Sequence, residues 1–130
     1  MKRIAGVSAV LLLAIASSAS AAQPTCSIHP KKGATKEELA SLAKVSQSDA
    51  QAAALATFKD SSKTTVKEVE LEAEHGCLIY SFDIAVSGKS GVQEVQVDAG
   101  NAKVLSSKHE SPKAEAAEKA KEKAEKKPKS

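Results

Sequence analysis

Apolar and polar residues alternate with a period of two along the second half of the chain, from Val66 to Leu105. In the first alternating segment the apolar residues fall on one side and four glutamates fall on the other. The alternation resumes after His75-Gly76 and again from Val92. A period of two over this length indicates antiparallel strands with one buried face. The sequence therefore predicts strands at about 65–74, 78–87 and 92–98.

The dipeptide His75-Gly76 predicts the register of the first two strands. A two-residue turn there pairs Glu74 with Cys77 and brings the apolar residues of the two strands opposite one another, as hairpin pairing requires. Glycine supplies the positive φ that such a turn needs, and histidine tolerates it. The same register places Cys77 on the glutamate side. If Cys77 is bonded to Cys26, the N-terminal segment must therefore reach this end of the hairpin.

A helical repeat precedes the strands. Ser46 is a typical N-cap, and Ala50, Ala53, Ala54 and Phe58 then recur at the spacing of one helix face. The spacing predicts a helix at about 47–59 that lies close against the apolar side of the sheet because its contact residues are small. The expected fold class is therefore α+β, with this helix packed on one face of a small antiparallel sheet.

The segments at both ends of this unit leave alternatives open. Thr35-Lys36-Glu37-Glu38 matches a capping box and predicts an additional short helix at about 36–43, whereas residues 42–45 fit a short edge strand equally well. Residues 98–102 are rich in turn formers. Lys103-Val104-Leu105 then either returns as a final short strand or begins a terminal helix.

The first 22 residues have the layout of a secretory signal peptide. Lys2-Arg3 precedes an apolar run of about ten residues and a stretch of small residues suited to cleavage. This run falls well short of the ~20 residues that span a bilayer, so we expect no stable membrane insertion after cleavage. We expect a lead-in at 23–34 that holds Cys26, one folded domain at 35–107, and a flexible tail at 108–130 rich in Lys, Glu and Ala. The exported chain is then periplasmic or secreted.

The charge and cysteine content of the chain limit the possible partners and predict a covalent link. Residues 23–107 hold nine lysines against eleven carboxylates, so the domain lacks the basic surface that nucleic-acid binding needs. In the tail, the lysines exceed the glutamates by three; we expect it to be solvated, with an electrostatic tether as the alternative. Two cysteines in an exported chain predict one disulfide, Cys26–Cys77. It would close a loop of about fifty residues and contribute roughly 4 kcal/mol.

Catalytic motifs are missing from the sequence. There is no nucleophile elbow, phosphate loop or zinc-protease helix motif, so we expect no enzyme activity and no cofactor. The glutamates of the first strand lie on one exposed face and are the candidate interaction face, although such ladders often serve solubility alone: Glu68, Glu70, Glu72 and Glu74.

Metal or small-ligand binding is the alternative function. Cys26-x-x-His29 and His75-x-Cys77 supply two thiols and two imidazoles that suit a structural zinc. In an oxidising compartment the disulfide is the better prediction, and it would bring His29 and His75 into one neighbourhood. These two histidines are therefore weak metal candidates rather than an assigned site.

Several of these motifs, taken in order, resemble a PepSY domain. They are Ser46-x-x-Asp49-Ala50, the alternating run Glu70 to Phe82, Glu94-Val95-x-Val97-Asp98-Ala99, and Val104-Leu105. The resemblance covers about residues 42–106, so the 35–107 segment is expected to be a PepSY-type domain. One departure concerns the closing turn, where the family usually has a glycine and this chain has Ala102. Gly100-Asn101 is expected to carry the turn instead.

The resemblance implies a protein-interaction module. PepSY domains occur in the pro-regions of thermolysin-like metalloproteases and as single-domain exported proteins, so the implied partner is a peptidase or another cell-envelope protein, with peptidase inhibition as one outcome. A small sheet also offers a free edge for strand addition. We expect that edge at residues 92–98, provided that residues 103–105 do not cover it.

Overall fold

The computed structural model describes residues 25–126 of the 130-residue chain. The signal-peptide prediction at 1–22 therefore lies outside the described residues. The elements follow in the order α1 (Lys36–Leu42), α2 (Gln47–Leu55), the short 3₁₀ helix η1 (Ser61–Lys63), β1 (Thr64–Glu74), β2 (Cys77–Val86), β3 (Val92–Asp98), β4 (Val104–Glu110) and α3 (Pro112–Glu125).

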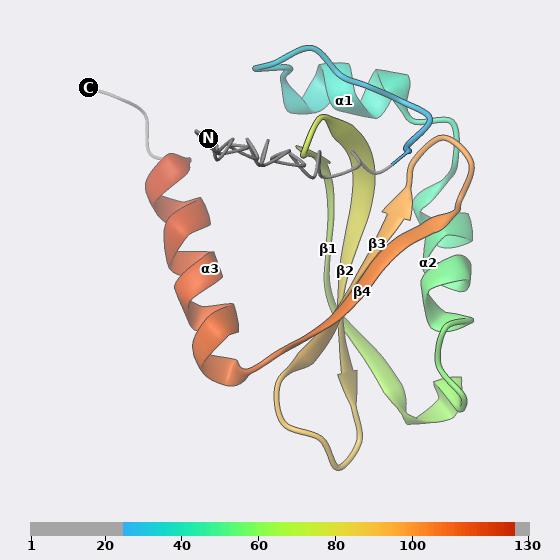
Figure 1. Cartoon of the computed structure of the whole chain (residues 1–130), viewed down its shortest axis with the longest axis vertical. Helices are drawn as coiled ribbons and strands as arrows, with labels where there is room; N and C mark the ends of the chain where they lie inside the picture. Colours follow the sequence, from blue (N-terminus) through green and yellow to red (C-terminus); the bar gives the residue numbers. More distant parts are fainter. Residues whose placement is uncertain (1–24, 127–130) are drawn as a thin grey trace, which may run out of the picture.

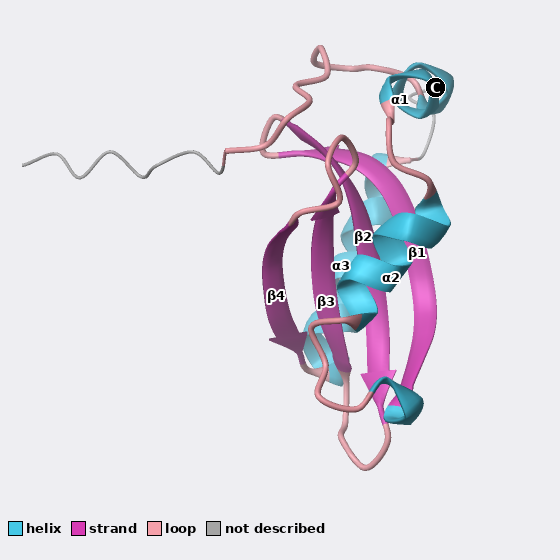
Figure 2. Ribbon diagram, turned by 90° about the vertical axis from the view of Figure 1, so that its right-hand side faces the viewer, coloured by secondary structure: helices cyan, strands magenta, loops and turns pink. Residues whose placement is uncertain are grey.

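The four strands form one antiparallel sheet in the order β1-β2-β3-β4, and helices lie on both of its sides. Figure 1 shows α2 on one side of the sheet, α3 on the other, and α1 across one end. The view turned by 90° shows the strands side by side with α2 crossing in front of them (Figure 2). The α+β class is confirmed, and the helix α3 adds a layer that the sequence analysis did not anticipate.

The hairpin between β1 and β2 has the predicted register. Glu74 pairs with Cys77, and Leu71 pairs with Tyr80. Both turn residues have positive φ, 49° at His75 and 78° at Gly76, which matches the twist of the flanking strands. The alternation of the sequence is therefore preserved across the pair, and the glutamates of β1 emerge on the side away from α2.

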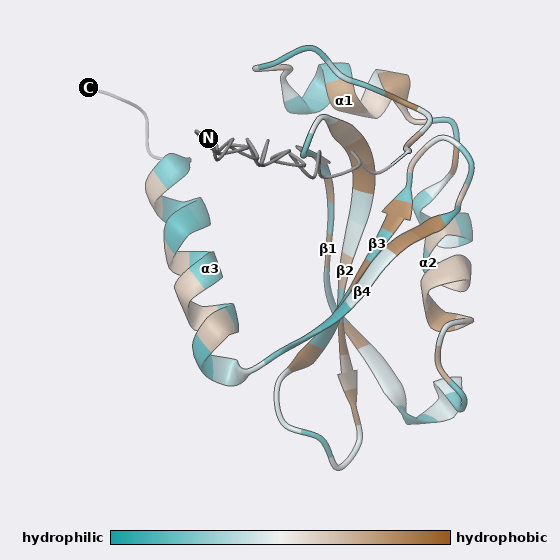
Figure 3. Cartoon of the chain, in the orientation of Figure 1, coloured by the Kyte–Doolittle hydropathy of each residue, from teal (hydrophilic) through white to brown (hydrophobic). Residues whose placement is uncertain are grey.

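The hydrophobic core fills the space between the sheet and α2. Ala50 and Ala54 are completely buried, and their lack of bulk lets the helix approach the large side chains of β2 and β3. The core residues alternate along those strands: Leu78, Tyr80, Phe82, Ile84, Val95 and Val97. In Figure 3 the brown stretches of the strands contrast with the pale and teal surface of α3. Apolar burial is thus concentrated on the α2 side.

Two helix predictions are resolved by hydrogen bonds at the helix ends. The capping box of Thr35 and Glu38 is present, so residues 36–42 form α1 and the edge-strand alternative at 42–45 is wrong. The predicted helix at 47–59 starts correctly but ends at Leu55. The hydroxyl of Thr57 donates to the carbonyl of Ala54 at 2.7 Å, a local bond that competes with further helix.

The C-terminal part of the sheet corrects two further expectations. Residues 104–110 form β4, which pairs with β3 along its length, so the predicted free edge at 92–98 is covered. The outer strands of the described sheet are β1 and β4. Residues 108–110, assigned to the flexible tail, belong to β4, and α3 follows after one residue. The predicted start of the tail at residue 108 is wrong, because the last residues of β4 are polar and show no alternation of apolar and polar positions.

The lead-in is fixed to the sheet by a disulfide and by a buried carboxylate. Cys26 and Cys77 are bonded, and the Ile28 carbonyl accepts from the Leu78 amide at 3.0 Å. Asp98 is completely buried. One of its carboxylate oxygens accepts from the Ser27 amide at 2.8 Å, and the other accepts from the Ser27 hydroxyl at 2.6 Å. The predicted disulfide is thus present, and Asp98 anchors the same segment from the neighbouring strand.

Asp98 also organises the closing turn. Its carboxylate accepts from the Gly100 amide at 2.7 Å, and its main chain bonds both Ala102 and Lys103. A side chain on Gly100 would collide with the Ser27 hydroxyl, so glycine here allows the lead-in to approach. The positive φ of the turn, 62°, falls on Ala102 and not on Gly100-Asn101 as expected.

Strain at Ala102 gives the first test. Left-handed backbone costs a non-glycine residue about 1–2 kcal/mol, so we expect Ala102→Gly to raise the free energy of unfolding slightly, despite the greater freedom of the unfolded chain. The matched control is Ala40→Gly in the exposed face of α1, which should lower it by about 1 kcal/mol. Urea unfolding of the two oxidised variants should separate them by roughly 1–2 kcal/mol. Equal losses would show that the turn is unstrained.

Removing the Asp98 charge gives the second test. Asp98→Asn replaces one acceptor oxygen by a donor that faces buried N–H and O–H groups, so we expect a loss of about 2–3 kcal/mol. Asp49→Asn, at the exposed first turn of α2, should cost less than about 1 kcal/mol. A similar loss in both variants, measured by chemical denaturation, would contradict the anchoring role.

Candidate functional site

The predicted interaction face of β1 is part of a larger carboxylate surface on the sheet. Strand pairing aligns Glu68 with Asp83, Asp83 with Glu94, and Val92 with Glu110, so the carboxylates of the four strands share one side. We call this surface the acidic face; it consists of Glu68, Glu70, Glu72, Glu74, Asp83, Glu94 and Glu110. Only the four members on β1 are predicted from the sequence, because they form an alternating run. The other members lie on three different strands, and only strand pairing brings them together.

Helix α3 lies over the acidic face and encloses a small cavity of about 40 Å³ with it. Three carboxylates of α3 line this cavity together with six of the face, and they are accompanied by one lysine, Lys119. The three are Glu115, Glu118 and Glu122. They recur at helical spacing within the tail, a pattern that identifies one side of a helix but gives no indication of what that side contacts.

Burial, with repulsion between neighbouring carboxylates after it, raises several pKa values around this cavity. Glu72 shows the largest effect: burial, followed by repulsion from Glu74 and Glu70 and then from Glu122 and Glu94, raises its pKa to about 7. Burial is also the main cause of the raised pKa values of Asp83 and Glu94, with nearby carboxylates adding to it. Protons are therefore held on this face at a pH where isolated carboxyl groups are ionised.

The carboxylates of α3 experience the same environment. Burial and then contact with Glu110 raise the pKa of Glu118, while burial and then contact with Glu70 raise the pKa of Glu122. Oxygens of Glu94, Glu110 and Glu118 lie within 4.8 Å of one another, as do those of Glu68, Glu70 and Glu122. Within the described part of the chain each of these two groups could supply three carboxylate oxygens to a cation.

Two lysines, Lys119 of α3 and Lys126 at its C-cap, balance part of this charge. The ammonium of Lys119 lies 3.5 Å from Glu68, and that of Lys126 lies 3.2 Å from Glu70. Lys119 also donates to Glu115 of its own helix at 2.8 Å. These ion pairs bind α3 across β1, at the outer edge of the sheet.

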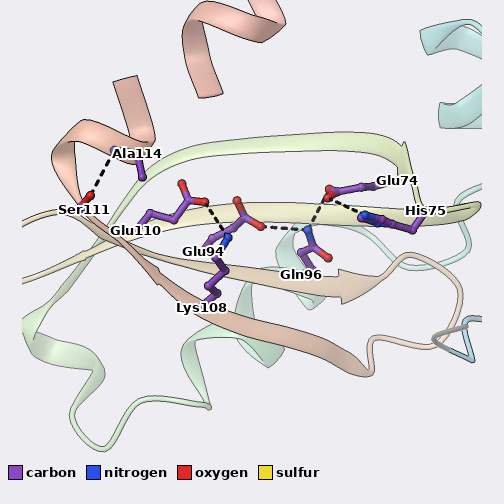
Figure 4. A network of polar contacts seen from close by, with 8 residues as sticks. All are labelled: Glu74, His75, Glu94, Gln96, Lys108, Glu110, Ser111 and Ala114. Atoms are coloured by element: carbon purple, nitrogen blue, oxygen red, sulfur yellow. Dashed lines mark hydrogen bonds and ion pairs between the residues drawn. The ribbon is translucent and has the colours of Figure 1, made fainter. Parts of the chain in front are cut away.

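A polar chain continues the acidic face toward the hairpin. The Gln96 side-chain amide donates to Glu74 at 2.9 Å and to Glu94 at 3.0 Å, so one neutral group links two carboxylates (Figure 4). At the other end of the network the ammonium of Lys108 lies 3.7 Å from the buried carboxylate of Glu110. Ser111 then caps α3 by accepting from the Ala114 amide. Hydrogen bonds thus hold the carboxylates in place.

The predicted metal candidates lie at the hairpin end, beside the disulfide. His29 contacts the Gly76 carbonyl at 3.0 Å, and His75 lies 4.0 Å from Glu74. Cys26 and Cys77 are bonded to each other, so their sulfurs are not available as thiolate ligands. Binding by the two imidazoles alone stays a prediction.

The arrangement suits recognition of positive charge. A fixed set of neighbouring carboxylates attracts cationic groups over several ångströms. It also offers ion pairs to the ammonium or guanidinium groups of a partner. Acid–base catalysis would instead need two carboxyl groups whose surroundings drive their pKa values apart within a substrate cleft. Here the resolved shifts on the cavity's carboxyl groups all point in the same direction.

Comparison with known proteins adds a family match. The model of the family described as "Peptidase propeptide and YPEB domain" (PepSY) matches residues 44–108, from just before α2 into β4. Comparison with curated proteins and with solved structures gives no significant match. No helix among residues 25–126 is long and apolar enough to cross a membrane.

The raised pKa of Glu72 predicts an unusual pH dependence. Between its unfolded value near 4.5 and its folded value near 7, the folded state holds the proton more tightly, so stability falls as pH rises through this window. Asp98 acts oppositely. Burial would raise its pKa, but the hydrogen bonds from Ser27 and Gly100 outweigh burial and lower it, so its contribution is lost only as pH falls below its ordinary value.

We therefore expect a higher melting temperature at pH 5 than at pH 8. Glu72→Gln should raise the melting temperature at pH 8 and flatten the difference between the two pH values, whereas Glu37→Gln on α1 should leave the difference unchanged. Thermal unfolding by circular dichroism measures both. An unchanged pH difference in Glu72→Gln would show that another group controls it.

Proposed function

Because this chain belongs to the PepSY family, we propose that it is an exported, non-catalytic module that binds a peptidase through its acidic face. The family match supports a peptidase-related role, and the acidic face supplies the surface for it. Other cell-envelope proteins with a basic contact surface form the wider partner class. The proposal retains the absence of catalysis and of cofactors that the sequence predicts.

The observation that carries this proposal is the concentration of charge around one cavity. Nine carboxyl groups and a single lysine line it, although the domain as a whole is only mildly acidic. Burial and, after it, repulsion between the carboxylates raise the pKa of Glu72, so keeping this face ionised costs folding stability. A basic partner would relieve the repulsion on binding, so the free energy lost in folding is recovered in the complex.

Export is supported by the disulfide and by the sequence of the first segment. Disulfides persist in oxidising compartments such as the periplasm and the extracellular space. The Cys26–Cys77 bond fastens the lead-in to the hairpin that carries part of the acidic face. A periplasmic or secreted protein would therefore present this face in its oxidised, fully tethered form.

Affinity capture from the exported fraction tests the proposal. The oxidised wild-type chain should retain a peptidase, and the double variant Glu72→Gln/Glu74→Gln should retain it at least about tenfold less, because two carboxylates of the face are lost without a change in shape. The matched control, Glu37→Gln/Asp49→Asn, removes two charges from α1 and α2 and should bind like the wild type.

The captured peptidase is then assayed on its own substrate. We expect the wild-type chain and the control variant to slow substrate turnover, and the acidic-face variant to do so less. Equal capture by all three proteins would overturn the role of the acidic face. The captured partners could instead be proteins other than peptidases, with binding still lost in the acidic-face variant. That result would support the acidic face as the binding surface and overturn the peptidase as the partner.

A further inference from the structure

We propose that α3 is an electrostatic strap over the acidic face, and that a lysine-rich helix of the partner displaces it. This inference rests on the proposed function, because it names the access control and the partner chemistry of the same face. It makes α3 an internal competitor: a helix of this chain occupies the surface until a more cationic helix takes its place.

The first argument is that α3 is held without a buried apolar residue of its own. None of its residues is buried, and all of its alanines are exposed. On the other side of the sheet, Ala50 and Ala54 of α2 are completely buried. Burial of apolar surface is the main reason why a helix stays attached to a folded domain. Helix α2 has this stabilisation, and α3 lacks it.

The second argument is that the attractive contacts of α3 are few and exposed. Its ion pairs to the sheet are Lys119 with Glu68 and Lys126 with Glu70, and the two lysine side chains remain 49% and 55% exposed. Ion pairs of this kind contribute about 0–1 kcal/mol each. The covalent link through Ser111 keeps α3 near the sheet but does not by itself hold it down.

The third argument is that α3 also brings repulsion. Glu118 approaches Glu94 and Glu110, and Glu122 approaches Glu68 and Glu70, with carboxylate oxygens within 4.8 Å in each group. These contacts oppose the two lysine pairs. The repulsion therefore offsets part of the attraction that holds α3 closed, which favours a segment that opens at low cost.

The same balance defines the occupant that would replace α3. A helix that keeps lysines seven residues apart, as Lys119 and Lys126 are, but lacks carboxylates at the positions of Glu118 and Glu122 retains the attraction and loses the repulsion. It must overcome the local concentration of the tethered α3, which is of millimolar order for a short link. Exposed lysines without glutamates on the contact side are thus the expected partner signature.

The first experiment examines the strap without any partner. Amide hydrogen exchange of α3 is measured in the oxidised full chain, in Lys119→Gln/Lys126→Gln, and in the control Lys113→Gln/Lys121→Gln. The control removes equal charge from lysines that pair with no carboxylate of the sheet. We expect exchange in α3 to accelerate about three- to tenfold in the first variant alone. Equal exchange in both variants would overturn the strap, whatever the acidic face binds.

The second experiment adds a defined competitor. The probe is a synthetic peptide with the sequence of residues 112–126 in which every glutamate is replaced by glutamine, and its control peptide also has every lysine replaced by glutamine. We expect the first peptide alone to bind, to accelerate exchange in α3, and to bind about three- to tenfold tighter to Lys119→Gln/Lys126→Gln than to the wild type.

The outcomes separate the two proposals. Peptide binding without faster exchange in α3 would overturn the strap and leave the acidic face as a docking surface. Binding that survives Glu68→Gln/Glu70→Gln, which removes the two carboxylates that pair with Lys119 and Lys126, would place the peptide elsewhere and overturn the face itself. No binding to either the wild type or the opened variant would overturn the cationic-helix partner.

Discussion

The buried carboxylate of Asp98 is the constraint on which the rest of the structure depends. A negative charge removed from water is tolerated only when donors surround it, and here the donors come from two separate segments, the lead-in at Ser27 and the closing turn at Gly100. The same residue ends β3 and directs the chain back into β4 through bonds to Lys103 and Ala102. The disulfide lies beside this anchor and fastens the lead-in a second time.

With that end of the sheet fixed, its two sides follow different physics. The α2 side is closed by apolar packing around Phe82 and Val95, which is strong, non-directional and insensitive to pH. The α3 side is closed by charges at the surface, where close carboxylates oppose the two lysine ion pairs. The α2 side therefore supplies the apolar burial of the domain, and the α3 side is the one from which we propose that a partner displaces the helix.

This division suits the role that we propose for this PepSY domain, the binding of another protein. The rigid hairpin presents carboxylates at fixed spacing, so a partner does not have to order them. Their raised pKa values mean that the face carries less charge in mildly acidic surroundings than its composition implies. The proposed binding of basic groups and displacement of α3 would therefore depend on the protonation of these carboxyl groups.

The sequence by itself determined the local structure. The alternation from Val66 onward gave the strands, His75-Gly76 gave the hairpin register, and Ser46 and Thr35 marked the helix starts, because each of these signals acts over a few residues. It also predicted the disulfide, which is present, and the shared side of the four glutamates of β1, whose role as an interaction face stays a prediction. Boundaries were less certain where local bonds compete, as at Thr57, or where a strand is polar throughout, as in β4.

Only the tertiary structure decided what the acidic face contains and what covers it. Asp83, Glu94 and Glu110 lie far from β1 in the sequence and join it solely through strand pairing. Helix α3 contacts this face through ion pairs and close carboxylates. Its sequence therefore contains no stripe of apolar residues that would predict the contact. Charge interactions of this kind depend on distances across the fold, and a linear pattern of lysines and glutamates does not encode those distances.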